Sequence, residues 1–234
     1  MAGDRNDNMR KIKTKLTDFC YFLSDKEPEI LIHAGTHGDE YEVIELVEMA
    51  LKKYERRMRP FLFVPAVSPS AVSQRTRKSI NGLDMNRDFT DSSTDFEIRA
   101  NMDLLTDKRF DLFVSFHEDP GLREYYIYDV GYSKAESKKV LEHNKYLKEN
   151  GVKLLNGVDD PEDPFLGYEF IDGYLKFVHP EDYHDDGTIS AWALNRHICD
   201  EYLCPEIPGK LSLEIKKEIV DSFFEKILLR EQGV

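Results

Sequence analysis

The sequence has few cysteines, no long apolar run and a shortage of positive charge. Its three cysteines, Cys20, Cys199 and Cys204, are an odd number without the spacing of a metal site. We therefore expect free thiols and a reducing, cytoplasmic compartment. No stretch approaches the roughly 18 apolar residues that a membrane span needs. The N-terminal residues lack the apolar segment of a signal peptide, so we expect neither export nor a membrane partner.

The charge balance is acidic, and this argues against a nucleic-acid partner. Asp and Glu number 45 against 32 Lys and Arg, which gives a formal net charge of −13. A polyanion is repelled by such a surface. Hydrophobic residues make up 41% and aromatic residues 12%, enough for a packed core. Without internal repeats, the 234 residues are expected to form a single domain over 1–234.

Apolar runs and helical spacing alternate along the chain. Apolar runs predict strands, and apolar residues at helical spacing predict helices. The expected strands are one or two within 11–24, then 29–34, 61–67, 111–116, 125–128 and 211–215. The expected helices are 39–57, 94–105, 133–149, 188–201 and 217–230, with a long irregular excursion over 151–187. This alternation predicts the α/β class: a single domain with a mixed, largely parallel sheet and helices on both faces.

His37 and Glu40 follow the expected strand 29–34 directly. An imidazole and a carboxylate three residues apart can converge on one ion if the turn between them is tight, which Gly38 permits. Zinc takes such nitrogen and oxygen ligands, and its catalytic sites use three protein ligands. Taken by itself, His-x-x-Glu also describes an ordinary polar turn after a core strand.

His117 follows a second apolar run, 111–116. Because ligands in open α/β sheets bind outside the carboxyl ends of the strands, His37, Glu40 and His117 are candidates for one His-His-Glu metal site. The neighbouring acids Glu118 and Asp119 could act as a general base or could orient a liganding imidazole.

The loop after strand 61–67 is basic within an acidic chain. Residues 75–87 hold four basic side chains, including Arg75, Arg77 and Arg87, together with Asn86. An arginine fork matches a carboxylate, and an asparagine amide adds a neutral donor. This loop could therefore hold the anionic end of a substrate. The alternative is a solvated loop whose arginines pair with Asp84 and Asp88.

Taken in order, these motifs carry a family resemblance over about residues 29–220. His37-x-x-Glu40, Gly-Leu-Asp-Met-Asn-Arg-Asp-Phe over 82–89, His117 and Leu-Ser-Leu-Glu over 211–214 resemble the zinc carboxypeptidases of the carboxypeptidase A type. That superfamily includes succinylglutamate desuccinylase and aspartoacylase-like deacylases. The resemblance implies one Zn²⁺ per chain on His37, Glu40 and His117.

The resemblance also implies the catalytic roles. Glu214 would be the general base, and Asn86 and Arg87 would bind the substrate carboxylate. Arg77 or Arg75 would polarise the scissile carbonyl, with Arg77 the preferred choice. The tyrosine of the pancreatic enzymes has no clear match: Tyr202 is nearest, and Trp192 occupies the approximate spacing.

The expected activity is hydrolysis of an amide next to a free carboxylate, in a small peptide or an acyl amino acid. A metallocarboxypeptidase is the first reading, because the chain ends before the C-terminal β domain that the deacylases usually carry. An N-acyl amino acid deacylase needs the same groups and is the alternative. A metal-binding protein without catalysis is a third reading, which the presence of Glu214 and Arg87 disfavours.

Overall fold

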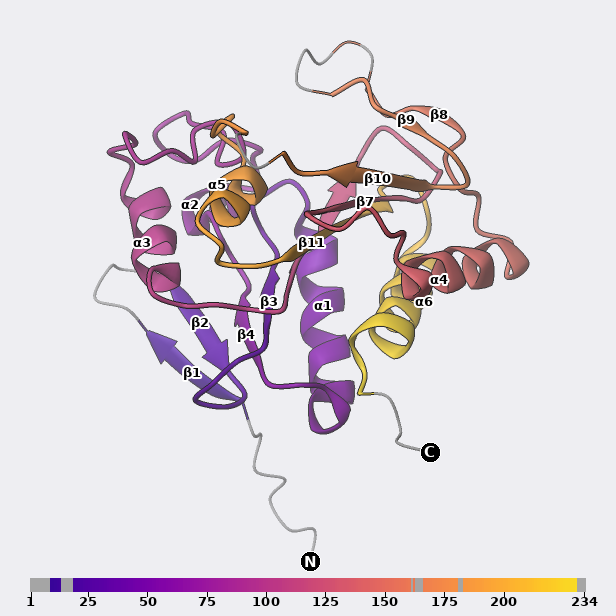
Figure 1. Ribbon diagram of the computed structural model, residues 1–234, viewed down its shortest axis with the longest axis horizontal. Coiled ribbons are helices and arrows are strands. Elements are labelled where there is room, and N and C mark those ends of the chain that lie inside the picture. The colour runs from indigo at the N-terminus through magenta and orange to yellow at the C-terminus, as the bar shows by residue number, and fades with distance from the viewer. Residues whose placement is uncertain (1–8, 14–18, 161, 163–165, 181–182, 231–234) are drawn as a thin grey trace, which may run out of the picture.

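The chain folds around one mixed sheet with helices on both sides (Figure 1). The structure is a computed structural model, and it describes residues 9–13, 19–160, 162, 166–180 and 183–230. The strand order is β1-β2-β4-β3-β5-β11-β7-β10, with β6 paired to β11. The α/β class predicted from the sequence is confirmed, whereas the single-domain extent over 1–234 stays a prediction.

The strands of the main sheet are short. They are β1 (Arg10–Lys13), β2 (Cys20–Leu23), β3 (Ile30–His33), β4 (Phe61–Val64), β5 (Leu112–Ser115), β6 (His117–Asp119), β7 (Tyr126–Gly131), β10 (Tyr174–Val178) and β11 (Glu201–Pro208). A separate hairpin pairs β8 (Gly157–Val158) with β9 (Glu169–Phe170).

The helices of the described residues include those expected over 39–57 and 94–105 in the first half of the chain, together with a short helix over 69–74 that the sequence did not predict. They are α1 (Tyr41–Tyr54), α2 (Pro69–Gln74), α3 (Phe96–Leu105), α4 (Lys138–Glu149), α5 (Ile189–Asn195) and α6 (Leu213–Phe223), with a 3-10 turn η1 (Glu55–Arg57) and a π-helical turn η2 (Phe224–Leu228).

Two hydrophobic cores lie on opposite faces of the sheet. Side chains of α1, α4 and α6 pack on one face, against residues such as Ile32 and Phe63. Side chains of α3 and α5 pack on the other face, against residues such as Leu31 and Phe113. Successive side chains of a central strand point into opposite cores. Because both faces of the sheet are covered, nearly every position of such a strand is apolar, and the strand is a continuous apolar run in the sequence.

The carboxyl ends of the central parallel strands meet at one edge. β3 runs parallel to both β4 and β5, and β5 runs parallel to β11. The segments that follow β3, β4 and β5 therefore leave the sheet side by side. This geometry gathers the sequence motifs in one place.

Most of the wrong secondary-structure predictions lie in the second half of the chain. The strand expected over 211–215 is wrong, because α6 begins at Leu213 with Ser212 as its N-cap residue. Ile219, Val220 and Phe223 fall at helical spacing and are buried. Residues 151–187 were expected to be irregular, but their described part contains three strands, of which β10 joins the main sheet.

The strand β11 has no counterpart among the elements predicted from the sequence. Pro205 and Pro208 lie within it, and prolines argue against a central strand because they cannot donate to the ladder. The structure accommodates Pro205 where β11 changes partner. Tyr202 and Leu203 pair with β5, and Glu206 to Pro208 pair with β6.

Candidate active site

The loop after β3 carries the first two candidate metal ligands. Gly38 lies against α2 so closely that an added Cβ would sit 1.9 Å from the carbonyl oxygen of Ala71. Its N–H donates to the carbonyl of Thr76 at 2.8 Å. Only glycine fits this approach. The tight turn expected from Gly38 is therefore present, and it brings His37 and Glu40 together.

The structure gathers His37, Glu40 and His117 into one buried group. Each offers a ligand atom within 4.8 Å of the others. The Nδ1 atom of His37 lies 2.5 Å from Glu40 Oε1, and the Nδ1 atom of His117 lies 3.1 Å from Glu40 Oε2. Two imidazole nitrogens thus flank one carboxylate.

The electrostatics of this group favour a bound cation. Burial disfavours a charged imidazole, but Glu40 and Asp84 outweigh burial and raise the pKa of His37 to about 9. Burial likewise opposes ionisation of Glu40, yet His37 and His117 hold its pKa well below the usual range. Two nitrogens and a carboxylate are the donor set of catalytic zinc sites, so the residues present fit a divalent metal.

Asp84 is a site residue that the sequence analysis assigned only to charge pairing. Its Oδ1 atom lies 3.1 Å from His37 Nε2 and accepts the N–H of Asn86 at 2.9 Å. Its Oδ2 atom accepts from Arg77 Nε at 2.9 Å. Because a carboxylate only accepts, Asp84 and Glu40 each favour a proton on the ring nitrogen of His37 that faces them. If Nδ1 gives up its proton to bind a metal, Asp84 would keep the remaining proton on Nε2.

His117 is oriented in the same way from β5. Ser115 Oγ lies 3.1 Å from His117 Nε2, on the side of the ring away from Glu40. The backbone N–H of Glu118 donates to Glu40 Oε2 at 3.2 Å. The Glu118 side chain accepts from the buried ammonium of Lys216 at 2.9 Å. Glu118 is therefore committed to an ion pair, which weakens its candidacy as general base.

The basic loop contributes three of its four candidate residues to the pocket. Arg77, Asn86 and Arg87 line it together with the metal-ligand candidates. The side-chain oxygen Oδ1 of Asn86 accepts the N–H of Ile189 at the start of α5 at 3.1 Å, which leaves the side-chain NH₂ group of Asn86 as a donor. Gly187 packs so tightly on Arg87 that a Cβ would lie 1.9 Å from the carbonyl oxygen of Arg87.

Arg75 does not join them. It ends α2 in the left-handed conformation, and its guanidinium stacks 4.2 Å above the ring of Tyr41. Of the two arginines considered for the scissile carbonyl, only Arg77 lines the pocket. The pairing of Arg77 with Asp84 was the alternative reading of this loop, and the structure combines it with a place in the pocket wall.

The structure does not bring Glu214 to the metal-ligand candidates. Glu214 lies exposed in the first turn of α6 and is not a pocket-lining residue. Glu214 was expected on a strand over 211–215, and that strand is absent because α6 occupies these residues. Glu206, near the end of β11, lines the pocket instead and is the register partner of His117.

Glu206 combines burial with proximity to the site. Burial, reinforced by Glu40 and opposed by His117, raises its pKa to about 7. Its Oε1 atom lies 3.6 Å from the Cys204 thiol. A carboxyl group that titrates near neutrality beside a candidate metal site is suited to moving protons. The sequence does contain a signal, since Glu206 lies near the end of an apolar run. Pro205 and Pro208 argued against a strand there, so the run was not predicted as one.

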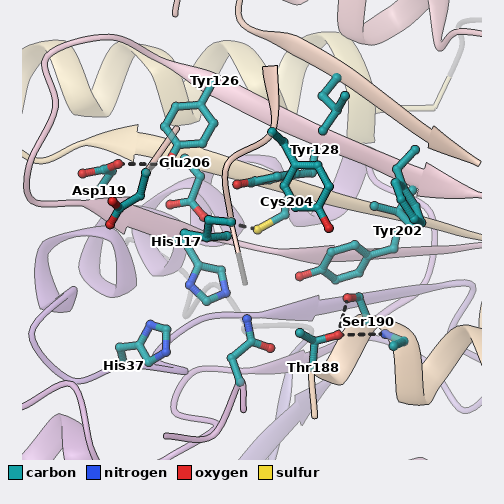
Figure 2. Close-up of a pocket in the computed structure, with 18 of the residues that line it drawn as sticks. His37, His117, Asp119, Tyr126, Tyr128, Thr188, Ser190, Tyr202, Cys204 and Glu206 are labelled. Atoms are coloured by element: carbon teal, nitrogen blue, oxygen red, sulfur yellow. Dashed lines mark hydrogen bonds between the residues drawn. The ribbon is translucent and has the colours of Figure 1, made fainter. Parts of the chain in front are cut away.

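The pocket has a volume of about 540 Å³, and aromatic rings form much of its wall. Figure 2 shows Tyr126, Tyr128 and Glu206 on one side of the two histidines and Thr188 with Ser190 on another. Tyr202 lines the pocket, whereas Trp192 packs on Phe89 with ring centroids 5.1 Å apart and lies outside it. Of the two residues considered for a catalytic tyrosine role, only Tyr202 is thus near the site.

Comparison with protein families agrees with this arrangement. Residues 26–150, more than half of the chain, match the succinylglutamate desuccinylase/aspartoacylase catalytic domain. The chain belongs to this family. The matched segment contains His37, Glu40, Arg87 and His117, and the expected superfamily is thereby confirmed. No curated protein sequence matches the chain significantly.

Solved structures of other proteins have the same fold as this chain. A protein of Shewanella amazonensis SB2B, provisionally assigned as a metallopeptidase, aligns with a TM-score of 0.70 at 17% identity and covers 96% of this chain and 88% of its own. A metallo-carboxypeptidase from Burkholderia cenocepacia aligns with a TM-score of 0.66 at 14% identity, covering 95% and 64%. An aspartoacylase family protein from Mesorhizobium loti aligns with a TM-score of 0.54 at 20% identity, covering 92% and 63%.

The helices give no indication of a membrane span. Among the residues that the structure describes, none of the helices combines the length and apolar character needed to cross a bilayer.

Proposed function

We propose that this protein is a zinc-dependent amidohydrolase that cleaves an amide bond next to a free carboxylate. The observation that carries the proposal is the convergence of His37, Glu40 and His117 with Glu206 and Arg87 in one pocket. These groups come from separate segments of the chain. Their arrangement matches the needs of amide hydrolysis: a Lewis acid site, a proton carrier and a carboxylate anchor.

His37, Glu40 and His117 would hold one zinc ion per chain. A bound zinc supplies Lewis acidity, which activates water at neutral pH and polarises a carbonyl oxygen. Asp84 and Ser115 fix the ring orientation of the two histidines, so the donor atoms are preorganised before metal binding.

Asn86 and Arg87 would bind the substrate carboxylate. Both line the pocket, and the contact of Asn86 with the start of α5 fixes its side chain. A hydrogen bond to a charged group contributes roughly 1.5–3 kcal/mol. Arg77, held by Asp84 at the pocket wall, would stabilise the negative charge that develops on the carbonyl oxygen during attack.

Glu206 would move the proton. Its carboxylate accepts a proton from the attacking water and returns it to the nitrogen of the leaving amine. Glu206 replaces Glu214 in this role, because Glu214 lies outside the pocket. In the metal-free protein burial raises the pKa of Glu206 to about 7, and a carboxyl group with a pKa at or below neutrality can serve as base and then as acid.

C-terminal peptides and N-acyl amino acids share the unit that this site would recognise, an amide followed by a carboxylate on the next carbon. The family match includes deacylases, and a solved structure of the same fold is a metallo-carboxypeptidase. The proposal therefore includes both a carboxypeptidase and an N-acyl amino acid deacylase, which differ in the size of the acyl group that they remove.

The test is hydrolysis of a small panel by zinc-loaded protein. The panel pairs N-acyl amino acids and dipeptides with the corresponding C-terminal amides. We expect cleavage of free acids, weak cleavage of amides, and loss of activity with a chelator that zinc restores. Stable zinc binding without hydrolysis of any member would favour a metal-binding protein without catalysis and contradict the proposal.

A further inference from the structure

Five aromatic rings form a continuous wall in the pocket. Centroids are 5.8 Å apart from Tyr126 to Tyr128, 6.1 Å from Tyr128 to Tyr168, 6.2 Å from Tyr168 to Phe177, and 6.0 Å from Phe177 to Tyr183. All five rings line the pocket. The row of rings is thus much longer than the surface that a small acyl group such as acetyl could contact.

The wall begins beside the proposed proton carrier. Tyr126 is the register partner of Glu206, and Tyr128 is the register partner of Cys204, in the antiparallel pairing of β7 with β11. Figure 2 shows Tyr126 and Tyr128 on the same side of the pocket as Glu206. A substrate whose amide lies at Glu206 therefore places one substituent against these rings.

Three tyrosine hydroxyls of the wall donate to aspartate carboxylates. Tyr126 donates to Asp119 at 2.8 Å, and Tyr183 donates to Asp186 at 3.0 Å. Tyr128 donates to Asp159. The Asp159 carboxylate also accepts two backbone N–H groups of the segment that carries Tyr168, so it fixes that part of the wall.

These hydrogen bonds give the wall a negative character. The face of an aromatic ring attracts cations through its quadrupole, and a phenol that donates to a carboxylate has added electron density. Asp160 adds a further carboxylate to the pocket lining. Among the described residues that line the pocket, Arg77 and Arg87 are the only arginines and lysine is absent. Both arginines already have roles at the carboxylate and the carbonyl.

We infer that the substrate carries a positively charged group, an ammonium or guanidinium, which binds against the wall formed by Tyr126, Tyr128, Tyr168, Phe177 and Tyr183. This inference rests on the proposed function and narrows its substrate class. A second carboxylate on the substrate, as in a dicarboxylic acyl amino acid, would lie near the aspartates of this wall and be repelled by them. The preferred substrate is therefore an amide with one free carboxylate and one basic side chain.

The experiment compares three nearly isosteric side chains, those of lysine, norleucine and glutamate. One series of acylated dipeptides varies the residue on the carboxylate side of the amide, and a second varies the residue on the acyl side. Binding to zinc-loaded protein is measured by calorimetry, and kcat/KM is measured on the same compounds. In one series the lysine compound should exceed norleucine about three- to thirtyfold, as a cation–π contact predicts, and glutamate should be weakest.

Two substitutions at one position test the aromatic origin of this preference. Tyr183→Leu should reduce the lysine-to-norleucine ratio about two- to fivefold. Tyr183→Phe keeps the ring and should reduce it less. Tyr146→Leu is the matched control, because Tyr146 lies on α4, contacts Lys226 and is not a pocket-lining residue; the ratio should be unchanged.

The inference and the proposed function fail differently. Equal or better values for norleucine than for lysine in both series would overturn the cationic substrate, even if hydrolysis is rapid. Equal values for glutamate and norleucine would overturn it as well. A lysine preference in binding without any hydrolysis would support the inference and overturn the proposed activity.

Discussion

Replacing Glu206 with glutamine tests the assignment of the proton carrier. Glutamine has nearly the same volume and keeps an oxygen that can face the Cys204 thiol, which lies 3.6 Å from Glu206 Oε1. The fold and the metal site should therefore be preserved. The neutral amide cannot accept a proton, so the substitution removes general acid–base catalysis. Such catalysis typically contributes about 10²–10⁴-fold in rate.

The expected loss in kcat is thus about 10²–10⁴-fold, which corresponds to roughly 2.7–5.5 kcal/mol of transition-state stabilisation. KM should change little, because Glu206 does not contact the substrate carboxylate in this account. In the wild type, activity should rise with pH as Glu206 loses its proton. Its pKa is about 7 in the metal-free protein, and a bound cation lowers it, so this rise should lie at or below pH 7.

The assay is steady-state hydrolysis of an N-acyl amino acid over pH 5–9, with zinc content measured in the same samples. Glu214→Gln is the matched control, since Glu214 is exposed at the start of α6, and its activity should equal that of the wild type. Full activity of Glu206→Gln with normal zinc content would refute the assignment. Loss of activity in Glu214→Gln alone would restore the residue that the sequence motif suggested.

Three further predictions concern the substrate anchor and the metal site. Arg87→Ala should weaken cleavage of free-acid substrates about ten- to a hundredfold, from the 1.5–3 kcal/mol of a charged contact, and leave amidated ones unchanged; equal losses would remove carboxylate recognition. Zinc affinity, measured with a competing chelator, should fall about tenfold per pH unit below pH 9, because a proton on His37, whose pKa is about 9, competes with the metal; a flat profile would contradict this. Ser115→Ala should weaken zinc binding about ten- to a hundredfold, because Ser115 orients His117 from the far side of the ring; unchanged affinity would make that contact incidental.

The residues that follow apolar strands could be predicted from the sequence. His37 and His117 each follow such a strand, and parallel strands place their carboxyl ends at one edge. That rule places the candidate ligands together from the sequence alone. The role of Asp84 was less accessible, because contacts with His37 and Arg77 across the loop depend on how the loop closes.

Glu206, the proposed proton carrier, could not be predicted, because a local pattern conflicted with the tertiary structure. Leu211 to Ile215 alternates like a short strand, yet α6 begins at Leu213, and Leu213 and Ile215 remain exposed. Pro205 argued against a strand over 201–208. In the structure Pro205 lies where β11 changes partner from β5 to β6, a position where a missing backbone N–H is tolerated. Propensity rules describe isolated segments, and here the pairing of strands decided the outcome.

His37, Glu40 and His117 are proposed to form a zinc site, on which every proposed catalytic role depends. The most direct measurement is zinc uptake by metal-free protein, followed by calorimetry and native mass spectrometry, for the wild type, His117→Ala and the control His184→Ala, whose histidine is exposed. We predict about one zinc ion per chain for the wild type and the control and none tightly bound for His117→Ala. No uptake by the wild type, or undiminished uptake by His117→Ala, would contradict the account.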